Sequence, residues 1–158
     1  MVNTSTHDTA TTGDIQKAKF SRILVAIDGS DASMHAADYA VSLSKENNAE
    51  LYALHVIRAD VDLFGVHPNS EYTATMKNEG EKYLDKVKFK ANEKNTEIKT
   101  EIIISINIPG GIVDYAEEKN IDLIVIGTRG RSGFKKLMLG SVASHIVTYA
   151  HCPVLVVK

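Results

Sequence analysis

Cysteine is almost absent from this chain, and so are the features of membrane-spanning and nucleic-acid-binding proteins. The 158 residues include one cysteine, Cys152, which excludes an intramolecular disulfide and a cysteine-built metal site. We interpret Cys152 as a small core residue rather than a reactive thiol. No segment has the length and continuous apolarity of a membrane helix. The formal net charge is −2 and no basic face is evident, so neither a membrane nor a nucleic acid is expected as a partner.

Large apolar residues are scarce at the N-terminus. Residues 1–19 are mostly Thr, Ser, Asp and Lys, a composition that cannot offset the entropy of ordering, and we expect a flexible tail there. Residues 20–158 have the length of one domain with a substantial core. The first residues also lack the apolar core of a signal peptide, so the cytoplasm is the expected location.

The most distinctive stretch of the chain runs from Ile121 to Val142. Its apolar run Leu123–Ile126 is rich in β-branched residues and too short for a helix, which predicts a strand buried on both faces. Glycines and basic residues then alternate before Gly140-Ser141 begins a helical pattern. The alternating residues are Gly127, Arg129, Gly130, Arg131, Gly133, Lys135 and Lys136. Backbone N–H groups at glycines and at a helix N-terminus favour an anion, so we predict a phosphate site at the carboxyl end of a parallel strand.

Apolar runs and helical patterns alternate along the whole domain. The predicted strands are 22–27, 50–57, 97–106, 123–126 and 153–157. The predicted helices start at Ser30 or Asp31 and run to Asn47, then cover 70–94, 109–120 and 141–150, with a loop at 58–69. Five strands alternating with four helices predict a doubly wound parallel α/β sheet with helices on both faces. The final strand is short and apolar, and we expect a homodimer to cover its edge through Pro153–Lys158.

Known catalytic and metal-binding patterns are missing. No Gly-x-x-x-x-Gly-Lys-Ser/Thr string occurs, and the first strand ends in Ile-Asp-Gly-Ser rather than in a dinucleotide-binding fingerprint. Ser141 and His145 lie one helical turn apart, but a helix-terminal hydroxyl and an unrelated histidine are the simpler interpretation. We interpret His55, inside a strand, as a satisfied core or crevice residue. The histidines show no ligand spacing that would indicate zinc.

The glycine spacing resembles that of a known family. Gly127-x-x-Gly130, nine residues, then Gly140-Ser141 matches the nucleotide-binding pattern of the universal stress proteins. The run Ile23–Ser30 resembles the family's first strand and acidic turn, and Leu54-His55-Val56 its second strand. The runs 121–127 and 152–157 resemble its last two strands, so the resemblance covers about 20–158.

This resemblance implies an adenine nucleotide alpha hydrolase-like fold with strand order 3-2-1-4-5, dimerisation through the last strand, and binding of ATP. The cofactor-binding residues implied by position are Ala26, Asp28, Val56, Gly127, Arg129, Gly130, Arg131, Ser132, Gly133, Gly140, Ser141, Val142 and Ala143. Asp28 is the implied metal residue, holding Mg²⁺ or Mn²⁺ through water, with the ion seated mainly by phosphates.

Two positions depart from the family pattern. Asn107 replaces a glycine two residues before Pro109, and we expect asparagine to preserve the turn because it tolerates left-handed backbone. Ala143 replaces a residue that often carries a hydroxyl, which removes one phosphate contact.

The resemblance implies a nucleotide-gated dimeric regulator in the stress response, read by an unidentified protein partner through the glycine loop or through residues 61–70. One alternative is a slow ATPase or phosphotransferase in the same pocket; whether the chain is an enzyme stays open, and no catalytic residue is assigned. The other alternative is a dimer scaffold that binds AMP, another small anion or no nucleotide.

Overall fold

The computed structural model describes residues 19–128 and 139–158. The predicted N-terminal tail, up to residue 18, lies outside the described residues. No helix within the described ranges is long and apolar enough to cross a membrane.

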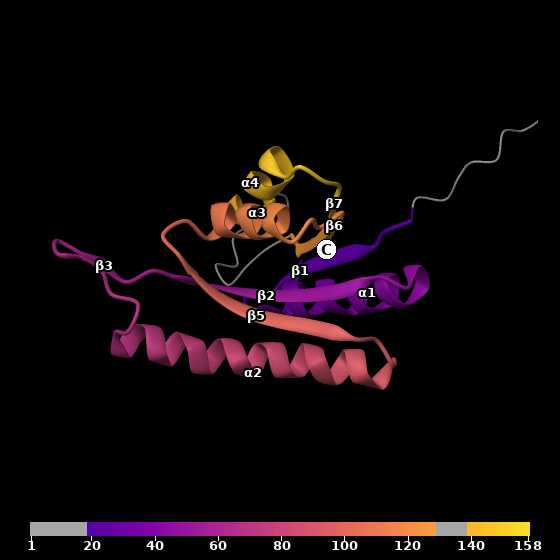
Figure 1. Cartoon of the computed structure of the whole chain (residues 1–158), viewed down its shortest axis with the longest axis horizontal. Coiled ribbons are helices and arrows are strands. Elements are labelled where there is room, and N and C mark those ends of the chain that lie inside the picture. The colour runs from indigo at the N-terminus through magenta and orange to yellow at the C-terminus, as the bar shows by residue number, and fades with distance from the viewer. Residues whose placement is uncertain (1–18, 129–138) are drawn as a thin grey trace, which may run out of the picture.

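Five parallel strands form one sheet, in the order β5-β2-β1-β6-β7 (Figure 1). They are β1 (Arg22–Ala26), β2 (Glu50–Arg58), β5 (Ile98–Ser105), β6 (Leu123–Gly127) and β7 (Val154–Val157). Counted as the five strands predicted from the sequence, this is the order 3-2-1-4-5, so the predicted fold class and strand order are confirmed.

Four helices cover the two faces of the sheet. They are α1 (Asp31–Asn47), α2 (Glu71–Glu93), α3 (Ile108–Glu118) and α4 (Ser141–Tyr149). Figure 1 shows α1 and α2 on one side of the sheet and α3 and α4 on the other. Each face has its own core, one packed against α1 and α2 and one against α3 and α4. The direction of winding therefore reverses between β1 and β6.

The first helix illustrates how the sequence sets the packing distance. Ala36, Ala37 and Ala40 are fully buried, and small side chains let a helix approach a sheet closely. The Ser30 side chain accepts a hydrogen bond from the Ser33 N–H and begins the helix. Asn48 ends it in left-handed backbone, with φ of 53°. The helix covers Asp31–Asn47, the range predicted from the sequence.

The first strand lies between β2 and β6, and both of its faces are covered. Ile23, Leu24 and Val25 have no exposed surface, as predicted for a strand buried on both faces. Beside β6, the Asp122 carboxylate accepts hydrogen bonds from the Ser21 N–H (2.8 Å) and the Arg22 N–H (3.1 Å). These contacts fix the start of β1 against a segment 100 residues away in the chain.

Residues 58–69, predicted as a loop, contain a small antiparallel hairpin. Its strands are β3 (Val61–Asp62) and β4 (Gly65–Val66), paired Val61 to Val66 and Asp62 to Gly65. Gly65 has φ of 122°, a backbone conformation that glycine adopts readily and other residues rarely adopt. The hairpin projects from the body at the end of β2 (Figure 1).

The turn before α3 differs from its prediction. Asn107 has φ of −129° and not the left-handed backbone expected from the family's glycine. Its side-chain oxygen accepts a hydrogen bond from the Gly110 N–H at 3.4 Å, so Asn107 serves as the N-cap of α3. Pro109 occupies the first turn of this helix, as predicted. The turn survives because asparagine caps the helix, and not through left-handed backbone.

Candidate functional site

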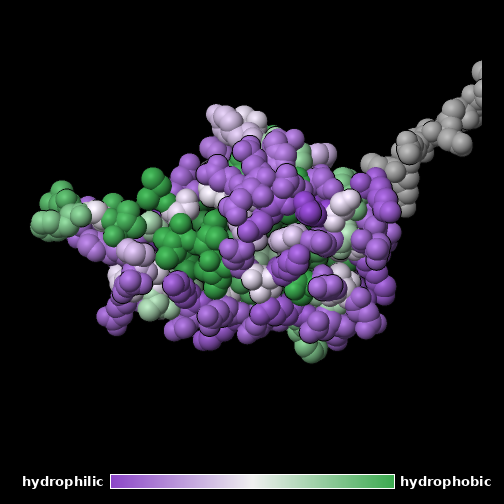
Figure 2. All heavy atoms as spheres, in the orientation of Figure 1, coloured by the Kyte–Doolittle hydropathy of each residue, from purple (hydrophilic) through white to green (hydrophobic). Residues whose placement is uncertain are grey.

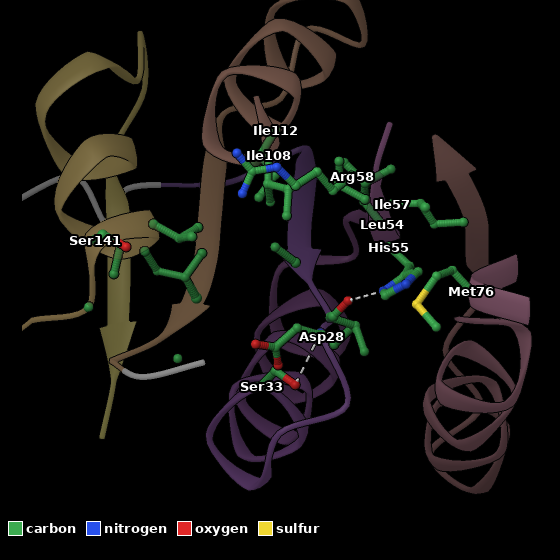
Figure 3. Close-up of a pocket in the computed structure, with 18 of the residues that line it drawn as sticks. Asp28, Ser33, Leu54, His55, Ile57, Arg58, Met76, Ile108, Ile112 and Ser141 are labelled. Carbon is green, nitrogen blue, oxygen red and sulfur yellow. Dashed lines mark hydrogen bonds between the residues drawn. The ribbon is translucent and has the colours of Figure 1, made fainter. Parts of the chain in front are cut away.

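A cavity of about 510 Å³ lies where β1, β2 and β6 end and α4 begins. This is the point at which the winding of the sheet reverses, the position where open α/β sheets hold ligands. Its lining is mostly apolar with a few polar groups, as is usual for a small-molecule site. Figure 3 shows Asp28 and Ser33 at the start of α1, with Ser141 at the start of α4 across from them.

The turn after β1 presents the Asp28 carboxylate to the cavity. Asp28 Oδ1 accepts hydrogen bonds from the Ser30 N–H (2.9 Å) and the Ser30 hydroxyl (2.5 Å). The Asp28 N–H donates to the Ser33 hydroxyl oxygen at 3.4 Å, and that hydroxyl donates to the Ser30 carbonyl at 2.9 Å. Gly29 makes the turn possible, because its φ of 81° is rare for other residues. Asp28 therefore orders the start of α1 through Ser30 while it lines the cavity.

The start of α4 forms the opposite wall. The Gly140 N–H donates to the Thr128 carbonyl at 2.9 Å, so this group, expected to face a phosphate, is already bonded. No side chain caps the helix, and the first-turn residues Ser141, Val142 and Ala143 line the cavity. The N–H groups of a first helical turn have no partner within the helix, and the helix dipole makes this end attractive to an anion.

His55 supports the floor of the cavity. Its Nδ1 donates to the Ile27 carbonyl at 2.7 Å, which leaves Nε2 without the proton in the neutral ring. The ring is 8% exposed and packs edge-on against Tyr83, with ring centroids 5.7 Å apart. A Cβ at Gly80 of α2 would overlap this ring, so the glycine makes room for it. The interpretation of His55 as a satisfied crevice residue is confirmed.

The structure brings eight of the thirteen sequence-predicted site residues to this one cavity. They are Ala26, Asp28, Val56, Gly127, Gly140, Ser141, Val142 and Ala143. The other five lie outside the described residues; they are Arg129, Gly130, Arg131, Ser132 and Gly133. The ligand contacts assigned to all thirteen stay predictions.

Several lining residues were not predicted from the sequence. They are Ile27, Ser33, Leu54, His55, Ile57, Arg58, Tyr72, Met76, Ile108, Ile112, Ile126 and Thr128. Arg58 ends β2 and carries the one arginine or lysine side chain on the described part of the lining. Its place directly after a predicted buried strand was a usable signal. Tyr72 and Met76 come from α2, and nothing in their sequence indicates that this helix reaches the cavity.

A metal ion has one acidic residue available on the described lining. That residue is Asp28, and no group of three His, Cys, Asp or Glu side chains among the described residues is arranged to hold a metal. A Mg²⁺ or Mn²⁺ ion seated here would take most of its oxygen ligands from phosphates and water, the coordination common for Mg²⁺. One carboxylate at the mouth fits such an ion and not a protein-built metal centre.

The last strand lies at the margin of the sheet. β7 pairs with β6, and within the described sheet its other edge has no neighbour. The Pro153 carbonyl accepts a hydrogen bond from the Ile124 N–H, and the Val157 carbonyl accepts one from the Thr128 N–H. Because alternate residues of a parallel strand bond to opposite sides, the N–H groups of Val154 and Val156 point away from β6. Cys152, just before β7, packs partly buried against the core, and burial raises the pKa of its thiol. This agrees with its interpretation as a core residue.

The fold and the cavity define an open, doubly wound α/β protein with a ligand-sized site at its switch point. A model of the "Universal stress protein family" matches residues 19–158. Universal stress protein YxiE of Bacillus subtilis is 44% identical over 149 residues, covering 88% of this chain and 99% of YxiE. The chain belongs to the universal stress protein family.

Solved structures show the same similarity. The universal stress protein UspA from Lactobacillus plantarum superposes with a TM-score of 0.75 at 30% identity, covering 89% of this chain and 99% of UspA. A universal stress protein in complex with cAMP superposes with a TM-score of 0.65 at 25% identity, covering 89% of this chain and 98% of that one.

Proposed function

We propose that this protein is a nucleotide-gated regulator of the stress response that acts as a dimer in the cytoplasm and binds ATP in the cavity at the switch point. The observation that carries the nucleotide site is that the Asp28 turn and the α4 N-terminus face one cavity from opposite sides. An anion at α4 and a phosphate-bound Mg²⁺ or Mn²⁺ near Asp28 suit this arrangement. The similar protein solved with cAMP supports an adenine nucleotide as the ligand class.

The cavity has the size and polarity for the base and ribose of such a ligand. Its volume of about 510 Å³ lies within the range of roughly 300–1,000 Å³ usual for small-molecule sites. Val56 lies at the end of β2, and Ile108 and Ile112 of α3 add apolar surface on the same side of the sheet. The apolar residues would hold the adenine ring, with the Val56 backbone meeting its polar edge. The phosphates would extend toward Ser141 and Val142.

The first experiment identifies the nucleotide that the purified protein carries. The protein is denatured, and the released nucleotide is identified by chromatography. We expect ATP in near-stoichiometric amount. AMP alone would contradict the ATP assignment, because it would indicate a monophosphate site. An empty protein whose melting temperature does not change with Mg-ATP would refute nucleotide binding altogether.

A pair of aspartate variants tests the role of Asp28. Asp28→Asn removes the one carboxylate on the described lining, and we expect affinity for Mg-ATP to fall by about tenfold, the effect of one lost charged contact. Affinity for ATP without metal should change less. Asp31→Asn is the matched control, since Asp31 lies three residues further on, is exposed and does not line the cavity. Equal effects of the two substitutions in calorimetry would remove Asp28 from the site.

A substitution in the glycine loop tests the wider assignment. Gly130→Val places a branched side chain on the expected phosphate path, and we expect it to abolish nucleotide binding. Unchanged ATP affinity in a folded Gly130→Val variant would show that the phosphates lie elsewhere.

The dimer is proposed to form through the outer edge of β7. Proline is tolerated at an edge position whose N–H faces outward, so Val156→Pro removes one pairing donor while the strand keeps its bonds to β6. We expect Val156→Pro to lose an association step that Val156→Thr, which keeps the N–H, retains in sedimentation experiments. A Val156→Pro variant with the same oligomeric states as Val156→Thr would place the interface at another surface.

A further inference from the structure

The hairpin of β3 and β4 carries the most exposed apolar side chains in the described residues. Leu63 is 100% exposed and Phe64 is 91% exposed, and both lie at the tip between the two short strands. Figure 2 shows this tip as an apolar projection from a mostly hydrophilic surface. Burying a leucine or a phenylalanine side chain is favourable, so side chains as exposed as these two forgo that stabilisation. Such a tip indicates a surface that another molecule covers.

The tip is held in one shape by its own hydrogen bonds. Asp62 Oδ1 accepts from the Phe64 N–H at 2.7 Å and lies 2.8 Å from His67 Nε2. The His67 N–H donates to the Asp60 carbonyl at 2.7 Å, which closes the base of the hairpin. Because the turn is already ordered, Leu63 and Phe64 can be covered with little further loss of backbone entropy.

The apolar surface of the hairpin continues onto the body of the protein. The Ala59 N–H donates to the Ser105 carbonyl at 2.9 Å, which places the hairpin base beside the exposed Ile106. On its other side, the Thr73 hydroxyl donates to the His67 carbonyl at 3.3 Å and ties the hairpin to the first turn of α2, where Tyr72 is half-exposed. Figure 2 shows apolar surface on the hairpin and on the body next to it.

We propose that this patch, formed by Val61, Leu63, Phe64, Val66, Tyr72 and Ile106, binds the same patch of a second copy of the chain. A projecting tip beside apolar surface on the body is self-complementary: about a two-fold axis, each tip contacts the surface beside the other. The patch is distinct from the β7 edge, which lies at the opposite side of the sheet from β5 and β2. The inference does not rest on nucleotide binding.

The exposed area supports a second copy as the occupant. At about 150–250 Å² for a whole aromatic side chain and somewhat less for an aliphatic one, the exposed parts of the six residues amount to roughly 700 Å². Specific protein interfaces bury about 800 Å² on each partner. The patch therefore approaches the size of one half of such an interface. Combined with pairing at the β7 edge, it would give each chain two self-complementary interfaces, which would join dimers into larger assemblies.

Sedimentation velocity over a wide range of protein concentration tests this interface. The test variant is Leu63→Asp/Phe64→Asp, and Phe89→Asp is the matched control, because Phe89 is 64% exposed on α2 and lies outside the patch. We expect the wild type and Phe89→Asp to show an association step that the double variant lacks. Two central interface residues justify a rise in its dissociation constant on the order of 100-fold or more.

Photo-crosslinking from position 64 locates the contact. With benzoylphenylalanine in place of Phe64, we expect a cross-linked dimer whose link maps to residues 61–66, Tyr72 or Ile106 of the second copy. Links to the β7 edge, or links only within one chain, would overturn the proposal. So would a double variant with the same oligomeric states as the wild type at every concentration, which would leave the tip for a different protein. Circular dichroism and the melting temperature confirm that each variant is folded.

Discussion

Replacing Gly80 by alanine should have opposite effects on stability depending on the residue at position 55. Alanine in place of glycine inside a helix stabilises by about 1 kcal/mol through backbone entropy alone. At Gly80 the new Cβ would overlap the His55 ring, with the Cγ and Nε2 atoms each 3.1 Å away. The ring cannot turn aside freely, because its Nδ1 is bonded to the Ile27 carbonyl and Tyr83 packs against it.

Overpacking of this kind costs about 1–3 kcal/mol, so Gly80→Ala should destabilise the wild type by up to about 2 kcal/mol once the helix gain is subtracted. In a His55→Ala background the overlap is gone, and the same substitution should stabilise by about 1 kcal/mol. Chemical denaturation of the four proteins of this double-mutant cycle measures both values. A Gly80→Ala substitution that stabilises both backgrounds equally would refute the contact between α2 and the cavity floor.

Three further predictions concern the cavity and the hairpin. Gly127→Ala places a Cβ 2.7 Å from the carbonyl carbon of Ala32 and should destabilise by about 1–3 kcal/mol in denaturation experiments, whereas Gly110→Ala, whose Cβ meets side-chain atoms of Asn107 and no backbone, should cost less. The Asp62 carboxylate raises the pKa of His67, and the His67 ring lowers the pKa of Asp62. The stabilising contribution of His67 is full below about pH 6.5 and is lost as the pH rises through its raised pKa. The contribution of Asp62 is full above about pH 3.9 and is lost as the pH falls through its lowered pKa. The hairpin is therefore most stable between these two pH values. In Asp62→Asn, NMR titration should find the pKa of His67 closer to 6.5, because the carboxylate that raises it is gone. Ala143→Ser should strengthen ATP binding about 2- to 10-fold, the effect of one added hydrogen bond. If calorimetry shows no larger gain for ATP than for AMP, residue 143 does not contact the terminal phosphates.

The centre of the sheet was predictable because β1, β2 and β6 are buried on both faces. A run such as Ile23–Ala26 has no alternation and few other structural options, so both its type and its place in the sheet follow from the sequence. The hairpin was not predictable, because strands of two residues are too short to show a period. Asn107 was misjudged for a related reason: an asparagine before a helix serves either as left-handed backbone or as a cap, and the sequence does not distinguish them.

The cavity was predictable in part. Asp28 and Gly127 lie at or just after strand ends, and strand ends in a parallel sheet meet at one edge. Ser141 starts the helix that follows β6. Tyr72 and Met76 reach the same cavity from α2. Their place could not be predicted, because it depends on where the start of this long helix lies relative to the sheet. The tautomer of His55 is likewise set by the carbonyl of Ile27, which follows β1 and lies 28 residues away in the chain.

The pairing of β1 with β6 has a consequence for how the protein folds. One wall of the cavity, on β1 and β2, joins segments that are close in sequence and can form early. The other wall forms only when a loop of about 100 residues closes, like the loop between Arg22 and Asp122, which are in contact. Closing a loop of this length costs much chain entropy and is therefore slow. A ligand held between the two walls would therefore bind only after the last long-range step, and it would shift the folding equilibrium by mass action toward chains that have completed it.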